Sequence, residues 1–85
     1  MGLSERDREL LDFERASWQI SGPKEAAIRA ELSLSSTRYY ERLAELVDDG
    51  DAYAYDPLLV LRLRQKREDR LARKFVGREA GPRRR

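Results

Sequence analysis

Helix breakers occur at only four places between residues 4 and 76, and their positions constrain the fold more than any other feature. They are Ser21-Gly22-Pro23, Ser33-Leu34-Ser35, Asp48-Asp49-Gly50 and Asp56-Pro57. Between them, apolar residues recur three, four and seven positions apart, as on one face of a helix, and no segment alternates as a strand does. The pattern predicts an all-α protein, a compact bundle of about four helices with a long basic C-terminal helix.

The ends of these helices follow from local residue preferences. Ser4 followed by Asp7 resembles a capping box, and Ser35 is suited to cap another helix. Pro23 and Pro57 suit first turns, because the amide that proline lacks would be unpaired there. We therefore expect helices over residues 4–21, 23–32, 35–47 and 57–76.

The stretch 27–46 follows the apolar pattern of a helix-turn-helix, in which two helices meet at a steep angle around a short turn. The residues expected to face inward are Ile28, Leu32, Leu34, Tyr39, Leu43 and Leu46. Ser33 stands where a glycine is common, and a small polar residue tolerates the turn there at moderate cost. In DNA-binding proteins the second helix of such a pair enters the major groove. A generic helical hairpin is the alternative interpretation.

Charge is divided unevenly along the chain. Residues 1–56 hold 7 Lys and Arg against 13 Asp and Glu, whereas residues 57–85 hold 11 against 3. A basic segment of this density indicates a polyanionic partner such as DNA, RNA or an acidic protein face, unless the charge merely solvates the segment. We expect residues 1–76 to form one helix-turn-helix domain, with the long basic helix from about 57, and residues 77–85 to form a basic flexible tail.

Two sets of residues are candidates for contacting double-stranded DNA. The base-reading set lies on the N-terminal half of the third predicted helix: Ser36, Thr37, Arg38, Glu41 and Arg42. Arg38 is expected to bond a guanine edge, Glu41 a cytosine amine and Arg42 a phosphate. The backbone-contacting set is Lys24, Arg62, Arg64, Lys66, Arg67 and Arg70, the last five spread over several sides of the fourth helix.

The acidic residues Glu41, Glu45 and Asp48 on the outward face would repel phosphates and are the best argument against sequence-specific binding.

Aromatic and leucine residues outside the turn are assigned to packing. We place Phe13, Trp18, Tyr39 and Tyr40 in the core, because aromatic residues at helical spacing are more often core than platforms for bases. Leucines in the segment 58–63 should pack on the other helices. Three later apolar residues, Leu71, Phe75 and Val76, are candidates for a second packing patch or for a contact between two copies in a homodimer.

The composition excludes most common catalytic designs. Without cysteine or histidine the chain has no disulfide, zinc finger, thiol nucleophile or Ser-His-Asp triad. We expect no cofactor and no enzymatic activity. The N-terminus lacks the apolar core of a signal peptide, and no stretch approaches the roughly 20 apolar residues of a membrane span. We therefore expect a cytoplasmic protein, located in the nucleoid if it binds DNA.

Four segments together resemble a family of small actinobacterial proteins of unknown function, DUF3263. They are LLDFERASW, KEAAIR, STRYYERL and DPLLVLRLRQKREDR, and the resemblance covers roughly residues 3–71. It implies an actinobacterial or actinophage source but supplies no activity and no site residues. The functional prediction therefore rests on the helix-turn-helix: a DNA-binding transcriptional regulator or nucleoid-associated protein. The alternative is an adaptor that docks on the transcription machinery or another regulator.

Overall fold

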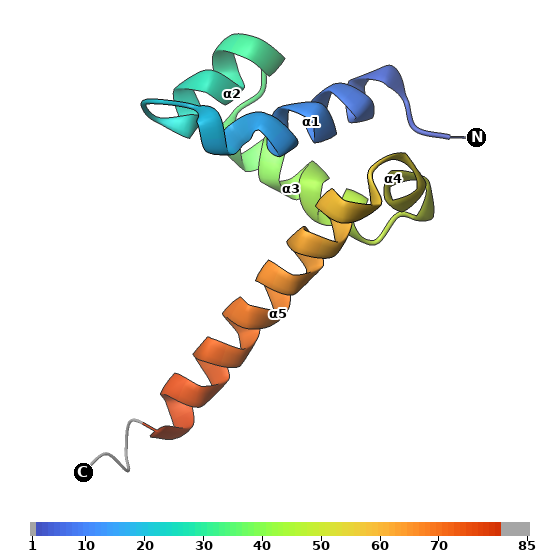
Figure 1. Ribbon diagram of the computed structural model, residues 1–85. Helices are drawn as coiled ribbons and strands as arrows, with labels where there is room; N and C mark the ends of the chain where they lie inside the picture. The colour runs from blue at the N-terminus through green and yellow to red at the C-terminus, as the bar shows by residue number, and fades with distance from the viewer. Residues whose placement is uncertain (1, 81–85) are drawn as a thin grey trace.

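The computed structural model describes the backbone of residues 2–80 and the side chains of residues 2–73. Within this part the chain forms five α-helices, one short 3-10 helix and no strand, which confirms the all-α prediction. In chain order the elements are α1 (Glu5–Ala16), η1 (Ser17–Gln19), α2 (Lys24–Leu32), α3 (Ser36–Val47), α4 (Gly50–Tyr55) and α5 (Pro57–Ala80). Figure 1 shows α1, α2 and α3 clustered together, with α4 at the edge of the cluster and α5 leaving it as a long arm.

Side-chain caps begin two of the helices where the sequence predicts them. Ser4 Oγ accepts a hydrogen bond from the amide of Asp7 at 3.0 Å, and Ser35 Oγ accepts one from the amide of Arg38 at 3.2 Å. Each cap pairs an amide that has no partner within the helix and contributes about 1 kcal/mol. Between η1 and α2, Gly22 has a φ of 97°, a conformation that glycine adopts without the steric cost of a Cβ.

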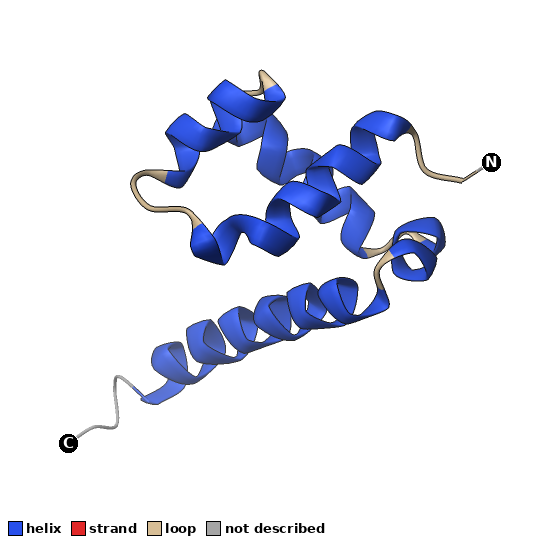
Figure 2. Cartoon of the chain, turned by 45° about the horizontal axis from the view of Figure 1, so that its top comes forward, coloured by secondary structure: helices blue, strands red, loops and turns tan. Residues whose placement is uncertain are grey.

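One continuous core joins all five α-helices. Its buried residues are Leu10, Leu11, Phe13, Ile28, Leu32, Tyr39, Leu43, Leu46, Ala52, Leu59 and Val60. Of the six residues predicted to face inward around the turn, five are buried, and Leu34 is half-buried against the same core. Burying a side chain of this size stabilises the fold by roughly 1.5–3 kcal/mol, so this cluster fixes how the helices pack. Figure 2 shows α5 departing from the side of this packed unit.

The helix α4 is absent from the sequence prediction. It contains only six residues, of which Ala52 is buried, and the Asp49 carboxylate caps it by accepting from the amide of Asp51 at 2.8 Å. A single short helix cannot show the repeated apolar spacing on which the prediction depends. In the structure it reverses the chain between α3 and α5 and brings the start of α5 back onto the core.

Two aromatic residues predicted to be buried are exposed. Trp18 is 74% exposed and Tyr40 is 46% exposed. The prediction for Trp18 was wrong because α1 ends at Ala16 and the chain continues as a 3-10 helix, whose tighter winding changes the direction of the next side chains. Tyr40 lies beside the inward-facing Tyr39 and packs edge-on against its ring at the rim of the core.

A buried glutamate joins α1 to the helix pair. Glu14 accepts a hydrogen bond from the Tyr39 hydroxyl and forms an ion pair with Lys24, whose Nζ lies 2.9 Å from the carboxylate. Burial, followed by the hydrogen bond to Glu14, raises the pKa of Tyr39 above its ordinary value of 10. Removing Lys24 would leave the buried charge of Glu14 poorly compensated. The contacts of Glu14 with Lys24 and Tyr39 therefore fix α1 relative to α2 and α3.

A second buried carboxylate joins α1 to the start of α5. The Arg15 guanidinium donates to both oxygens of Asp56, at 2.8 and 2.6 Å. These hydrogen bonds lower the pKa of Asp56, which also accepts from the amide of Leu59 at the first turn of α5. The predicted start at Asp56-Pro57 thus serves both as a cap and as a contact between helices.

The arm α5 is long, as predicted, and reaches Ala80. The prediction that leucines 58–63 pack inward was only partly right, because Leu59 and Val60 are buried but Leu58 and Leu61 face outward. Leu71 is exposed, and the side chains of Phe75 and Val76 lie outside the described part. The flexible tail predicted for 77–85 stays a prediction: 77–80 continue α5, and 81–85 lie outside the described residues. In the described part, no helix combines the length and apolar character needed to cross a membrane.

Candidate nucleic-acid interface

The turn between α2 and α3 separates the two helices sharply. Ser33 adopts the left-handed conformation, with φ 58° and ψ 35°, and its amide donates to the carbonyl of Arg29 at 3.0 Å. Glycine is the usual residue in this conformation because it has no Cβ, so Ser33 holds the turn at a cost of about 1–2 kcal/mol. Leu34 then packs on the core and Ser35 caps α3. The pair is therefore bent at the predicted position, not fused into one rod.

The first turn of α3 presents polar side chains to solvent. Glu41 is exposed in the second turn of the helix, and in the first turn Thr37 and Arg38 are exposed and Ser36 is half-buried. The opposite side of the helix is fixed in the core by Tyr39 and by the other inward-facing residues. Because this turn holds no acidic residue, the partial positive charge of the helix N-terminus is uncompensated there. The predicted base-reading residues thus share one accessible helix end, with the exception of Arg42.

Arg42 connects two helices. Its Nε and Nη2 atoms donate to the two oxygens of Asp7 in α1, at 2.9 and 2.7 Å, and its Nη1 donates to Glu45 at 2.5 Å. The hydrogen bonds from Arg42 lower the pKa of Asp7, and those same bonds raise the pKa of Arg42. A guanidinium with three donors engaged in this way holds α3 against α1, a role that the sequence did not predict.

Ion pairs partly neutralise the acidic face of α3. Glu45 is paired with Arg42, and Asp48 is paired with Arg67 of α5 at 3.1 Å. The hydrogen bond from Arg67 lowers the pKa of Asp48. Within the part of the chain that the structure describes, Glu41 is the one member of this predicted acidic trio without an ion pair. The repulsion expected between this face and a polyanion is correspondingly smaller.

Lys24 is committed to the interior of the helix cluster. Besides its ion pair with Glu14, its ammonium lies 5.5 Å from the centre of the Tyr39 ring and 5.3 Å from that of Tyr40. Burial alone would lower the pKa of Lys24, but the hydrogen bond and charge of Glu14 outweigh burial and raise it. Lys24, predicted to contact a DNA backbone, thus compensates a buried charge in this structure, and its contact with DNA stays a prediction.

The cations of α5 whose side chains the structure describes, from Arg62 to Arg73, divide into two groups. Arg64 donates to the carbonyl of Val47 at 2.9 Å, at the end of α3, and Arg67 pairs with Asp48, so both turn towards the body. The exposed cations are Arg62, Lys66, Arg70 and Arg73, which we call the basic stripe. Their spacings of four, four and three residues place them along one face of a helix. The helical repeat alone places cations on several sides of this helix, because it does not show which of them contact the body.

A shallow groove of about 290 Å³ connects Arg38 with the start of α1. Its lining includes Leu34, Arg38 and Glu41 from the turn and α3, and Arg6 from α1. Arg6 donates to the carbonyl of Leu32 at 2.6 Å, which completes the end of α2. Nothing in the sequence indicates that Arg6 lies near Arg38, because the two residues are far apart along the chain.

The fold defines an all-helical protein in which a bent helix pair exposes the first turn of its second helix and a basic arm leaves the same body. The sequence matches the family model described as "Protein of unknown function (DUF3263)" over residues 2–74, and the chain belongs to this family. This match confirms the family resemblance inferred from the four sequence segments. No curated protein and no solved structure matches the chain.

Proposed function

We propose that the protein binds double-stranded DNA, with the first turns of α3 in the major groove, and acts as a transcriptional regulator or nucleoid-associated protein. The observation that carries the proposal is the exposure of Thr37 and Arg38 at the N-terminal end of the second helix of a bent pair. Helix-turn-helix proteins read bases with this part of the helix. The neutralisation of Glu45 and Asp48 by arginines supports it, because it reduces the charge that opposes approach.

The proposal assigns a different task to each group of cations. Arg38 reads a base edge, since its guanidinium is exposed and suits bidentate bonding to guanine. The basic stripe on α5 contacts phosphates, which position a protein on DNA without reading sequence. Arg42, Arg64 and Lys24 hold the helices in place. The predicted contact set thus contracts to the exposed cations that are not engaged by another helix in the described part, and the protein binds its partner without performing chemistry on it.

A salt titration of binding to duplex DNA, combined with selection of a preferred sequence from a random pool, tests the proposal. Arg38→Ala should weaken binding to the selected sequence by about 1–3 kcal/mol and relax the preference at one position. Arg8→Ala is the matched control, because Arg8 is an exposed cation of α1 whose guanidinium donates to the carbonyl of Leu3. Absence of duplex binding at low salt, or equal losses for both variants, would remove the proposal.

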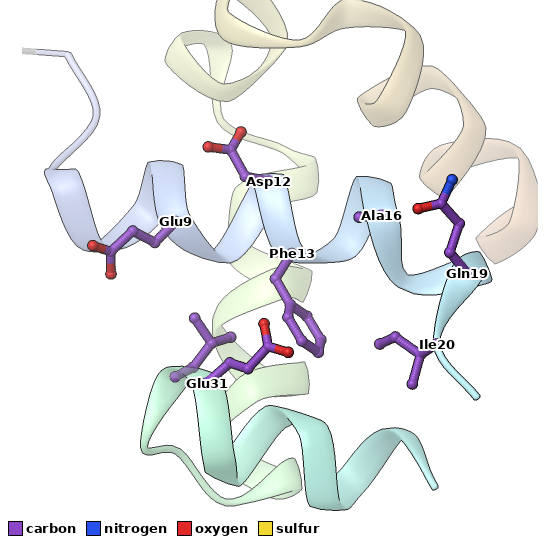
Figure 3. A pocket seen from close by; sticks show the side chains of 8 residues that line it. Glu9, Asp12, Phe13, Ala16, Gln19, Ile20 and Glu31 are labelled. Atoms are coloured by element: carbon purple, nitrogen blue, oxygen red, sulfur yellow. The ribbon is translucent and has the colours of Figure 1, made fainter. Parts of the chain in front are cut away.

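A second candidate function is an adaptor that binds a basic helix of a partner protein. It is favoured by a groove of about 540 Å³ between α1, η1 and α2, with Phe13, Ile20 and Leu32 among its lining residues. Figure 3 shows Phe13 pointing from α1 towards α2, with Glu31 beside it. Glu9, Asp12 and Glu31 line the groove, so it would repel a phosphate and attract a cationic amphipathic helix.

Charge reversal in this groove separates the two candidates. Glu9→Lys combined with Glu31→Lys changes two exposed side chains and should leave the fold intact. If the chain is an adaptor, the double variant loses affinity for a cationic amphipathic peptide in a calorimetric titration. If the chain binds DNA alone, the wild type does not bind this peptide, and the double variant binds duplex DNA at least as tightly as the wild type.

A further inference from the structure

The only tryptophan of the chain stands exposed beside the basic stripe. Trp18 of η1 lines a groove of about 270 Å³ together with Arg62, Leu63 and Lys66 of α5. An indole that is 74% exposed forgoes most of the stabilisation that its burial would give. Such a ring in a groove with two cations has the composition of a surface that binds a ligand, because an aromatic face and positive charges are offered together.

We propose that this groove binds a single-stranded nucleic acid segment, with an unpaired base stacked on Trp18 and the strand backbone on the basic stripe. Aromatic side chains serve as platforms for bases of any identity, and neighbouring cations neutralise the phosphates between successive bases. The site differs from the first turn of α3, which would read the edges of paired bases. The proposal therefore extends the proposed function: both use the basic stripe for phosphates, but Trp18 takes the place of Arg38 as the residue that contacts a base.

The geometry of α5 suits a strand that runs along the helix. Neighbouring stripe residues from Arg62 to Arg70 are four residues apart, so their Cα atoms rise by about 6 Å along the axis at each step. Arg73 continues the same face one turn further on. Lys66 and Arg70 line a second shallow depression with Arg73 and Asp69, directly beyond the groove that holds Trp18. Trp18 thus lies at the end of the stripe nearest the body.

Two carboxylates near the groove, Glu14 and Asp69, differ in how strongly they would repel a nucleic acid strand. Glu14 lines the Trp18 groove, but its charge is compensated by Lys24 and its oxygen accepts from Tyr39. Asp69 accepts from the side-chain amide of Gln65 at 3.0 Å and lines the depression beside the outer stripe. The groove around Trp18 therefore presents a net positive surface to a strand.

Quenching of Trp18 fluorescence is a direct readout, because no other tryptophan contributes to the signal. Titration with oligodeoxythymidine and with oligouridine should quench the emission in a saturable manner, and the ratio of the two affinities distinguishes DNA from RNA as the ligand. A fully paired duplex should quench less, since its bases are already stacked. Labelled oligonucleotides, followed by anisotropy, give the affinity of variants that lack the indole.

Three variants separate stacking from simple charge attraction. Trp18→Ala should weaken binding of the single strand by about 5- to 150-fold, and Trp18→Phe should restore part of the affinity because it keeps a ring. Lys66→Ala with Arg70→Ala should reduce the slope of log affinity against log salt by about 1.4, as expected for two lost phosphate contacts. Wild-type affinity in Trp18→Ala, or binding without quenching, would overturn the proposal. A wild type that binds neither oligonucleotide would overturn it too.

The same measurements keep this proposal distinct from duplex recognition. Arg38→Ala should leave single-strand affinity unchanged while reducing duplex affinity, whereas Trp18→Ala should do the reverse. If duplex binding fails but the single strand still quenches Trp18, the major-groove proposal is lost and the stacking site stands. If the single strand fails and sequence-selective duplex binding persists, the stacking site alone is refuted.

Discussion

Removing one hydroxyl group from the core tests the buried contact that holds α1 on the helix pair. Tyr39→Phe deletes the hydrogen bond to Glu14 but keeps the aromatic ring, which is fully buried and packs edge-on against Phe13 at a centroid distance of 5.7 Å. No cavity of significant size is created, because only one oxygen atom is lost. The measured change therefore reports the hydrogen bond and not the packing of the ring.

The expected loss is about 1.5–2 kcal/mol in the free energy of unfolding. A hydrogen bond to a charged group contributes about 1.5–3 kcal/mol, and the lower part of this range applies because Glu14 keeps its ion pair with Lys24. Truncation of the whole ring in Tyr39→Ala would cost more, about 3–5 kcal/mol, because it opens a cavity. For a small domain stable by about 5–15 kcal/mol, the Phe variant should still fold.

Urea unfolding followed by far-ultraviolet circular dichroism measures this loss. With a denaturant slope of about 1.5 kcal/mol per M, the midpoint of Tyr39→Phe should fall by about 1 M at unchanged slope. Tyr53→Phe is the control, because Tyr53 is exposed and its ring lies under Arg64. It should change the free energy of unfolding by less than about 0.5 kcal/mol. Equal midpoints for the two variants would refute the reasoning.

The pH dependence of stability gives a readout of the buried Tyr39 hydroxyl, whose pKa is raised first by burial and then by the hydrogen bond to Glu14. The pKa of Tyr39 is raised in the folded state, so the folded protein keeps this proton at pH values where the unfolded chain loses it. Stability from this group is complete below pH 10 and falls as the pH rises above about 10. The decline above pH 10 should be shallower in Tyr39→Phe, which has no proton to lose at this position.

Further predictions concern the turn, the acid limb of stability and the exposed indole. Ser33→Gly should raise the free energy of unfolding in urea by about 0.5–1 kcal/mol, because glycine adopts the left-handed conformation without strain. This gain exceeds the cost of the more flexible unfolded chain that glycine gives. A destabilised variant would contradict this. The pKa of Asp7 is lowered by Arg42, so its contribution is present above about pH 4 and is lost at lower pH. Asp7→Asn should therefore be less stable at pH 7 but differ less from the wild type near pH 2, as thermal unfolding at both pH values will reveal. Trp18 emission should resemble that of free tryptophan in water and be quenched efficiently by iodide, whereas a blue-shifted, protected emission would show that the indole is buried.

Local chemistry made much of the fold predictable from the sequence. Ser4 and Ser35 are caps whose partners lie three residues away, and Ser33 follows from the geometry of a turn between two helices. Each of these signals is contained within a few residues. The inward-facing residues around the turn were predictable for the same reason, since a helical repeat fixes which side chains share a face.

The parts that escaped prediction depend on contacts between distant segments or on one local departure from regular helix. Asp7 and Arg42 are 35 residues apart, and Arg15 and Asp56 are 41 apart. Nothing in their surroundings in the sequence identifies them as partners. Trp18 was misplaced because a helical repeat was extended through a segment that winds as a 3-10 helix. The sequence therefore predicted the region of α3 that forms the candidate site. It did not predict which cations there are free to contact a ligand.

These ion pairs connect the stability of the fold to the electrostatics of its surface. Arg42 and Arg67 hold α3 against α1 and α5, and the same guanidinium groups compensate Glu45 and Asp48 on the outward face of α3. A chain whose first 56 residues carry an excess of acidic groups thus compensates part of that charge on the outward face of α3. Because exposed pairs are screened by salt, this compensation is most effective at low ionic strength, where attraction between the basic stripe and phosphates is also strongest. Duplex affinity should therefore fall as the ionic strength rises, with a slope set by the number of phosphate contacts.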